Sequence, residues 1–207
     1  MVSPDRIFLL SPAWAGGKRY SFLLREQADF ELAIKLRQGA ATIGEIYSFI
    51  SGLYFRGKMA YAAAFRAAPE GLPPAVIITP GLGLITPETR MDIDQLRAVA
   101  NVPVSEENSA FRDTLFDAAK ILERRTNGTC SYVLLGSVAS SKYTGPLLEV
   151  FGERLLFPAD FVGRGDMSRG GLMLRRSASR IELDYVSVQG AQLRGSRPSR
   201  LEKQKAN

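Results

Sequence analysis

The sequence predicts an α/β fold: a three-layer sandwich with a mostly parallel central sheet and a C-terminal β-hairpin. Short apolar runs typical of buried strands alternate with segments whose apolar residues recur at helical spacing, which favours parallel strands joined by helices. The chain has 207 residues, of which 45% are hydrophobic, and this suits one domain. We expect that domain to span residues 1–190 and a basic, disordered tail to span residues 191–207.

The first strand and the first helix are expected within the N-terminal forty residues. Residues 6–11 form a short apolar run, which predicts a buried strand. A loop with Gly16 and Gly17 separates this run from residues 19–37, whose pattern predicts a single helix. Gly39 supplies the stop signal for that helix.

A second helix is expected from residue 42 onward. Thr42 and Glu45 have the spacing of a capping box, in which each side chain binds the other residue's backbone amide. Apolar residues then recur at helical spacing as far as Phe65. Gly57 interrupts this pattern, so we expect a break or a close packing contact near it. Residues 75–79 are β-branched and predict the second strand.

The same alternation continues through the middle of the chain. Residues 92–100 predict a short helix. A longer amphipathic helix follows, which we expect Ser105 or Ser109 to cap and residues 127–128 to end. Residues 131–137 predict the third strand.

The last part of the chain predicts a helix, a strand and a hairpin. Thr144 and Pro146 open a helix that runs to residue 151, and residues 154–157 predict the fourth strand. Residues 172–176 and 181–188 have the pattern of an antiparallel pair. We expect this pair to extend the sheet or to cap one of its edges.

The composition excludes several kinds of chemistry. The chain contains no histidine, which rules out Ser-His-Asp and Cys-His catalytic groups and histidine zinc sites. Its single cysteine, Cys130, has no partner for a disulfide within the chain, and we interpret it as a small buried residue. A bound metal would need carboxylate ligands, which suit magnesium. We expect neither a metal nor a cofactor.

Charge and terminal segments bear on partners and location. The formal net charge is +6, and much of the excess lies after residue 190. This tail either attracts nucleic acid nonspecifically or is a solvated extension. The apolar run at residues 7–10 is too short for a membrane span or a signal segment, so we expect a cytoplasmic protein without a membrane partner. Nothing in the pattern indicates an oligomeric state.

The expected parallel strands end in similar chemistry. Ligands of open α/β sheets bind beyond the carboxyl ends of the strands. Those ends carry Ser11, Thr79 and Ser137, and the fourth strand runs into a glycine-rich block. We therefore expect these residues to line a binding site on one rim of the sheet.

The loops at this rim supply further candidate contacts. Lys18 and Arg19 precede a helix and suit an anion, with a plain turn as the alternative. Gly83 lies in a Pro-Gly turn whose amides can approach a planar ligand. Lys142 and Tyr143 are neighbours that can bind a ligand or act as an acid–base pair, although no signature spacing marks them.

The glycine-rich block, residues 157–173, is the densest candidate. Arg164 and Arg169 are planar donors suited to phosphate or carboxylate. Asp166 lies between them and is the candidate catalytic base. The alternative is a purely structural glycine turn.

A segment of cations and aromatic residues lies in the second expected helix. Arg56 and Lys58 stand close to Tyr54 and Tyr61. Such a mixture can clamp a nucleotide or a single strand. The alternative is that the aromatic residues belong to the core.

Two short motifs carry a resemblance to a known family. One is a Leu-Tyr…Lys…Tyr-Ala-like helix, here residues 53–62, and the other is a Gly-Leu-x-x-Pro turn after a strand, here residues 83–87. With the order of the other segments, they resemble an uncharacterised bacterial family of small α/β domains related to the peroxide-stress and archaeosine-synthase accessory domains. The resemblance covers roughly residues 6–175. Some of those relatives resemble uracil-DNA glycosylases in fold, which implies recognition of a nucleobase or nucleic acid, although the histidine that those enzymes use is absent here.

These observations predict a protein that binds a nucleotide, a nucleobase or a nucleic acid at the strand-end rim. If it is an enzyme, N-glycosidic bond chemistry would use Asp166 while Arg164 and Arg169 hold phosphate. The alternative is a noncatalytic nucleic-acid-binding or protein-interaction module.

Overall fold

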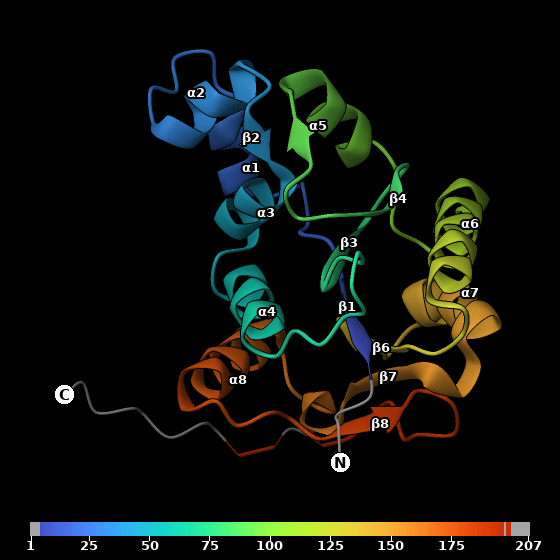
Figure 1. Ribbon diagram of the computed structural model, residues 1–207. Coiled ribbons are helices and arrows are strands. Elements are labelled where there is room, and N and C mark those ends of the chain that lie inside the picture. The colour runs from blue at the N-terminus through green and yellow to red at the C-terminus, as the bar shows by residue number, and fades with distance from the viewer. Residues whose placement is uncertain (1–4, 197, 200–207) are drawn as a thin grey trace.

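The computed structural model describes residues 5–196, 198 and 199, and a six-stranded sheet lies at its centre (Figure 1). In spatial order the strands are β4 (Gly83–Ile85), β3 (Ala75–Thr79), β1 (Arg6–Leu10), β6 (Ser131–Leu135), β7 (Leu155–Pro158) and β8 (Tyr185–Ser187). The four inner strands are parallel, whereas β4 and β8 pair antiparallel at the two edges. The mostly parallel α/β sheet is therefore confirmed.

Alternate residues of the central strands point into two separate cores. Phe8 and Leu10 of β1 pack into the first core, whereas Ile7 and Leu9 pack into the second. All four side chains are fully buried, as expected for strands that are covered on both faces. The molecule is therefore the three-layer sandwich that the sequence predicts.

Helices cover both faces of the sheet. The first core lies under α1 (Lys18–Leu23), α2 (Glu31–Arg37), α3 (Ile43–Ser51), α4 (Leu53–Ala64), α5 (Ile93–Ala100) and α8 (Asp166–Ser179). The second core lies under α6 (Ser109–Thr126) and α7 (Ser141–Phe151). A small antiparallel pair, β2 (Ala41–Thr42) with β5 (Arg90–Met91), joins the start of α3 to the segment before α5. Two 3₁₀ turns, η1 (Gly152–Arg154) and η2 (Ala159–Phe161), flank β7.

The second expected helix starts as its capping box predicts but is divided in two. Thr42 and Glu45 form the reciprocal pair of hydrogen bonds. Gly52, with φ of 60°, then separates α3 from α4, a conformation that glycine adopts at little cost. Gly57 makes the close packing contact that the sequence predicted as one of two alternatives. A Cβ at this position would lie 2.7 Å from the carbonyl oxygen of Gly170. Glycine at positions 57 and 170 lets α4 and α8 pack against each other.

Three local predictions are wrong. The single helix expected over residues 19–37 is two short helices, α1 and α2, separated at residues 24–30. The N-cap of α6 is Asn108 instead of Ser105 or Ser109. Helix α7 starts at Ser141 and contains Pro146 beyond its first turn, where the missing amide of proline removes one backbone hydrogen bond of the helix.

The glycine-rich block also differs from the prediction. Residues 172–176 belong to helix α8, so they form no hairpin with residues 181–188. The C-terminal antiparallel strand does exist as β8, but its partner is β7. Gly170 of α8 lies where that helix meets α4, which is a tertiary contact that no local pattern reveals.

The predicted tail falls only partly within the described residues. Ala191 and Leu193 pack against the second core, and Arg194 donates to the carbonyl oxygen of Ala139 at 3.0 Å. Position 197 and residues 200–207 lie outside the described residues, so the disorder expected there stays a prediction. Among the described residues, no helix is both long enough and apolar enough to cross a membrane.

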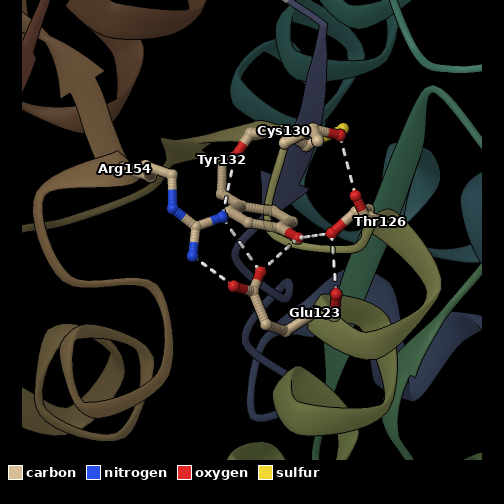
Figure 2. A network of polar contacts seen from close by, with 6 residues as sticks. Glu123, Thr126, Cys130, Tyr132 and Arg154 are labelled. Atoms are coloured by element: carbon tan, nitrogen blue, oxygen red, sulfur yellow. Dashed lines mark hydrogen bonds and ion pairs between the residues drawn. The ribbon is translucent and has the colours of Figure 1, made fainter.

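A polar network closes the amino ends of β6 and β7 (Figure 2). The guanidinium of Arg154 pairs with the carboxylate of Glu123 and also donates to the carbonyl oxygen of Cys130 at 3.1 Å. Tyr132 donates to the same carboxylate at 2.8 Å, and its hydroxyl lies 2.6 Å from that of Thr126. The network fastens the end of α6 to two neighbouring strands. Burial of Cys130 in the second core agrees with its interpretation as a packing residue.

Candidate functional site

The strand order places a crevice between the carboxyl ends of β1 and β6. The chain leaves β1 toward α1–α4 on one face of the sheet, and it leaves β6 toward α7 on the other face. Loops that diverge in this way leave a gap at the switch point, which is where open α/β sheets bind ligands. Ser11 follows β1 and Ser137 closely follows β6, so two of the expected rim residues flank the crevice.

A pocket of about 440 Å³ occupies this crevice, and we call it the cationic pocket. Seven of the residues expected from the sequence line it: Ser11, Lys18, Arg19, Ser137, Lys142, Tyr143 and Asp166. Three of these side chains are cationic and one is a carboxylate. The pocket therefore favours an anion.

A second pocket, of about 320 Å³, adjoins the cationic pocket, and we call it the apolar pocket. Its walls come mainly from apolar residues, among them Tyr47, Leu96 and Val99. The two pockets share Pro12, Trp14, Lys142 and Tyr143. Trp14 is 78% exposed, although it is the only tryptophan of the chain. An exposed indole between an apolar and a cationic pocket is available for stacking on a flat ligand.

The cationic side chains differ in how firmly they are held. Arg19 donates to the carbonyl oxygen of Phe49 at 3.2 Å. Lys142 lies 5.2 Å from the ring centre of Tyr143. Lys18 is exposed at the start of α1. Because α1 has only six residues, the anion site is better attributed to these side chains than to the dipole of that helix.

Lys58 lies beneath the cationic pocket and is completely buried. Its Nζ donates to the carbonyl oxygen of Ser11 at 2.8 Å and to the Ser11 Oγ at 2.7 Å. It also lies 4.0 Å from the ring centre of Tyr54. Among the described residues, no carboxylate reaches ion-pair distance of this amine.

Burial changes the acid–base behaviour of Lys58. Removal from water disfavours the ammonium and lowers the pKa of Lys58 to about 7. The negative charge of Asp166 opposes this shift, and the positive charge of Arg169 adds to it. Lys58 can therefore gain and lose its proton near neutral pH, which is a role that histidine fills in other proteins. This chain has no histidine.

Tyr54 supplies a second buried polar group at the same place. It lines the cationic pocket, yet its hydroxyl is buried and has no hydrogen-bond partner within the described residues. Burial raises the pKa of Tyr54 to about 12, while the side chains of Arg169 and Ser11 lower it. The hydroxyl is thus a protonated donor at neutral pH, and a buried donor without a partner is costly unless a ligand or water accepts from it.

Four expected site residues lie outside the cationic pocket. Thr79 is buried and donates to the carbonyl oxygen of Ile77. Gly83 has φ of 74° and packs on α6, where a Cβ would lie 2.6 Å from the Cβ of Ala118. Both residues have evident structural roles.

The two arginines of the glycine-rich block are likewise held by the protein. Arg164 donates to the carbonyl oxygen of Asp160 at 2.9 Å and to Ser168. Arg169 is buried and donates through Nε and Nη2 to the carbonyl oxygen of Phe161. Asp166 alone of that trio lines the pocket, with its carboxylate 3.7 Å from Arg169 Nη1 and largely exposed.

The basic and aromatic segment of α4 is not a surface clamp. Tyr54, Lys58 and Tyr61 are buried, and only Arg56 is exposed. The core alternative therefore holds for the aromatic residues. The burial of Lys58 beneath this site and the place of Trp14 in it were not predicted. Two sequence signals had named Tyr54 and Lys58 together, the mixture of cations and aromatic residues in α4 and the helix motif at residues 53–62.

Comparisons with known proteins do not identify this site. No family model, no curated protein and no solved structure matches this chain. The resemblance to the bacterial α/β family therefore stays a prediction. The described residues also contain no cluster of three or more acidic or cysteine side chains that could hold a metal ion.

Proposed function

We propose that the protein binds a nucleotide, with the nucleobase in the apolar pocket and the phosphate in the cationic pocket. The observation that carries this proposal is the shared wall between the two pockets at the switch point of the sheet. A ligand that spans both needs a flat apolar part and an anionic part. A nucleoside phosphate has both parts on one small molecule.

The phosphate end is supported by charge and by a free donor. Lys18, Arg19 and Lys142 line the cationic pocket, and their ammonium and guanidinium groups are ordinary phosphate ligands. The hydroxyl of Tyr54 adds a donor that lacks an acceptor within the described residues. A phosphate oxygen would satisfy it.

The nucleobase end is supported by aromatic surface. Trp14 is exposed at the junction of the pockets, and Tyr47 contributes to the apolar wall. Stacking of a base on an aromatic side chain contributes about 1–3 kcal/mol and tolerates any base. Binding is the whole of this proposal, and we assign no N-glycosidic step to Asp166 because its carboxylate is largely exposed and faces Arg169.

The single tryptophan makes the test direct. Trp14 fluorescence would be followed during titration with AMP, GMP, CMP and UMP, and in parallel with the nucleosides, ribose 5-phosphate and a single-stranded dT oligonucleotide. We expect a saturable change with the nucleoside monophosphates and weaker binding of both the nucleosides and ribose 5-phosphate. Binding should weaken as salt is added, because ion contacts to phosphate are screened.

Calorimetry on two variants completes the test. Trp14→Ala should raise the Kd for the best nucleotide about 5- to 150-fold, which corresponds to the loss of one stacking contact. Phe22→Ala is the matched control, because Phe22 is an exposed aromatic residue that lines neither pocket. Absence of binding at millimolar nucleotide, or equal loss in both variants, would contradict the proposal. Tight binding of the oligonucleotide alone would favour the nucleic-acid-binding module instead.

A further inference from the structure

The contact between Lys58 and Ser11 could serve catalysis, which is a role that ligand binding does not require. Lys58 Nζ lies 2.7 Å from the Ser11 Oγ and 2.8 Å from the Ser11 carbonyl oxygen. A neutral amine has two N–H donors and one lone pair. As the structure stands, Nζ donates to both oxygens of Ser11, and the Ser11 hydroxyl donates to the carbonyl oxygen of Leu135 at 3.5 Å. Once the amine is neutral, this hydroxyl can turn and donate to the lone pair of Nζ while the amine still donates to the Ser11 carbonyl oxygen. This is the arrangement in which a base activates a serine hydroxyl.

We propose that Ser11 is a nucleophile, that Lys58 is its general base, and that the protein transfers or hydrolyses an acyl group at the strand-end rim. The proposal goes beyond nucleotide binding and does not rest on it. Ser-Lys pairs carry out acyl transfer without histidine, and this chain has no histidine.

The position of Ser11 suits a nucleophile. It directly follows β1 and lines the cationic pocket, while Lys58 approaches it from the buried side. Gly136 lies next to it, and a Cβ at that position would come within 3.0 Å of the Ser11 Oγ. Glycine at this position therefore lets the Ser11 side chain pack directly against the backbone that follows β6. The surroundings of Lys58 supply the other requirement, because burial lowers its pKa to about 7 and leaves much of the amine neutral at physiological pH.

Tyr54 can supply the third element of such a site. Attack on a carbonyl creates an oxyanion, which needs a hydrogen-bond donor that is already in place. Tyr54 lines the same pocket, and its buried hydroxyl has no partner within residues 5–196. Its raised pKa keeps it protonated, so it can donate to the oxyanion.

The reaction balances with these groups and water. The Ser11 Oγ forms a bond to the acyl carbon as its proton moves to Lys58 Nζ, and the carbonyl π electrons move to the oxygen. The tetrahedral intermediate collapses, the bond to the leaving group breaks, and the leaving oxygen takes the proton from Lys58. Water then attacks the acyl-serine ester, again giving its proton to Lys58, and the released serine oxygen recovers a proton from it. The products are a carboxylic acid and an alcohol.

The lining of the pocket indicates the class of substrate. Cations outnumber carboxylates around Ser11. We therefore assign the substrate to esters that carry a negatively charged group, which those cations would hold while the carbonyl faces Ser11.

The test uses a biotin-linked fluorophosphonate, which reacts with activated serine hydroxyls. The full chain would be incubated with this probe, and the labelled residue would be located by peptide mass spectrometry. We expect one label on Ser11, with a labelling rate that rises as the pH passes through 7 and Lys58 loses its proton. Ser11→Ala should remove the label, and Lys58→Met should slow labelling by at least about 100-fold, within the range of general-base catalysis.

Two controls keep the test decisive. Ser131→Ala, at the opposite end of β6, should label like the unmodified protein. Because a buried lysine is replaced by a side chain of similar shape, Lys58→Met should remain folded, and circular dichroism would check this. Labelling of Ser11 that is equally fast in Lys58→Met, labelling elsewhere only, or no labelling of the unmodified protein would each overturn the proposal. None of these results would bear on nucleotide binding, which the fluorescence titration measures separately.

Discussion

The two ends of the central sheet treat buried charge in opposite ways. At the amino ends of β6 and β7, Arg154 and Glu123 neutralise each other, and Tyr132 and Thr126 complete their hydrogen bonds (Figure 2). At the carboxyl end of β1, Lys58 is fully buried with a serine as its polar partner and without a carboxylate at ion-pair distance among the described residues.

This difference separates a stabilising arrangement from a reactive one. Paired, hydrogen-bonded charges keep their ordinary ionisation and hold elements together. A buried amine without an ion pair destabilises its own charged form, which costs folding free energy at any pH below the usual lysine pKa. Perturbed groups of this kind cluster at functional sites. The comparison therefore favours the rim as the place for the chemistry that we propose.

The largest expected effect is on the pH dependence of folding. The pKa of Lys58 falls from its usual value near 10.5 to about 7 in the folded protein. Between these values the unfolded chain binds more protons than the folded one, so stability rises with pH by up to about 1.4 kcal/mol per unit. Urea unfolding at pH 7.5 and pH 9.5 should show a gain of about 2–3 kcal/mol from this group.

Lys58→Met isolates this contribution. The variant should be more stable than the unmodified protein at pH 7 and should lack the gain from Lys58 at higher pH. The stability of the variant must be subtracted from that of the unmodified protein at each pH. Burial raises the pKa of Cys130, and this lowers the free energy of unfolding over part of the pH range in which Lys58 raises it. Parallel stability curves for the two proteins would show that Lys58 carries no such cost.

The next effect concerns the opposite end of the sheet. Glu123→Gln removes the charge that pairs with Arg154 and weakens the acceptor of Tyr132, so we expect a loss of about 2 kcal/mol in the free energy of unfolding. Nucleotide affinity and serine labelling should not change. Glu153→Gln, a neighbouring exposed carboxylate, is the control and should alter stability by less than about 0.5 kcal/mol. An equal effect of both variants would remove the distinction between the two ends.

A smaller effect is expected on affinity alone. Lys18→Ala should weaken nucleotide monophosphate binding by about 1 kcal/mol, or roughly fivefold, since one exposed cation leaves the cationic pocket. Its unfolding midpoint should stay the same. Lys120→Ala, an exposed lysine on α6 outside the pocket, is the calorimetric control. A loss of stability in Lys18→Ala would mean that ion pairs stabilise the carboxyl end of the sheet as well.

The smallest effect is on the ionisation of Lys58. The charge of Asp166 raises the pKa of Lys58 against the dominant effect of burial. Asp166→Asn should therefore move the midpoint of the pH–labelling curve of Ser11 to lower pH without abolishing labelling. A complete loss of labelling would instead assign Asp166 a direct part in the reaction.

Local signals in the sequence predicted much of the fold. The capping box of Thr42 and Glu45 and the β-branched run of β3 are complete within a few residues, so their prediction needs no tertiary information. Helix α8 was misjudged because its glycines resemble a loop. Gly170 is needed because it contacts Gly57 of α4, about a hundred residues earlier in the chain. No local pattern contains that contact.

The candidate site was predicted in part for the same reason. Ser11 and Ser137 follow apolar strand patterns, so a shared rim could be inferred once the strands were taken as parallel. The burial of Lys58 depends on how α4 packs beneath β1, and a lysine in a helix ordinarily faces water. Arg164 and Arg169 were expected to face a ligand, but backbone carbonyl groups of their own segment already accept their hydrogen bonds.

A measurement of the Lys58 pKa is the most direct test of the contrast between the two ends of the sheet. Protein labelled with ¹³C at lysine Cε would be titrated by NMR, and the Lys58 signal would be assigned by its absence in Lys58→Met. We predict one lysine that titrates near pH 7, well below the others. If the Lys58 signal titrates near pH 10.5 with the remaining lysines, the contrast between the two ends of the sheet is contradicted, and with it the role of Lys58 as a base.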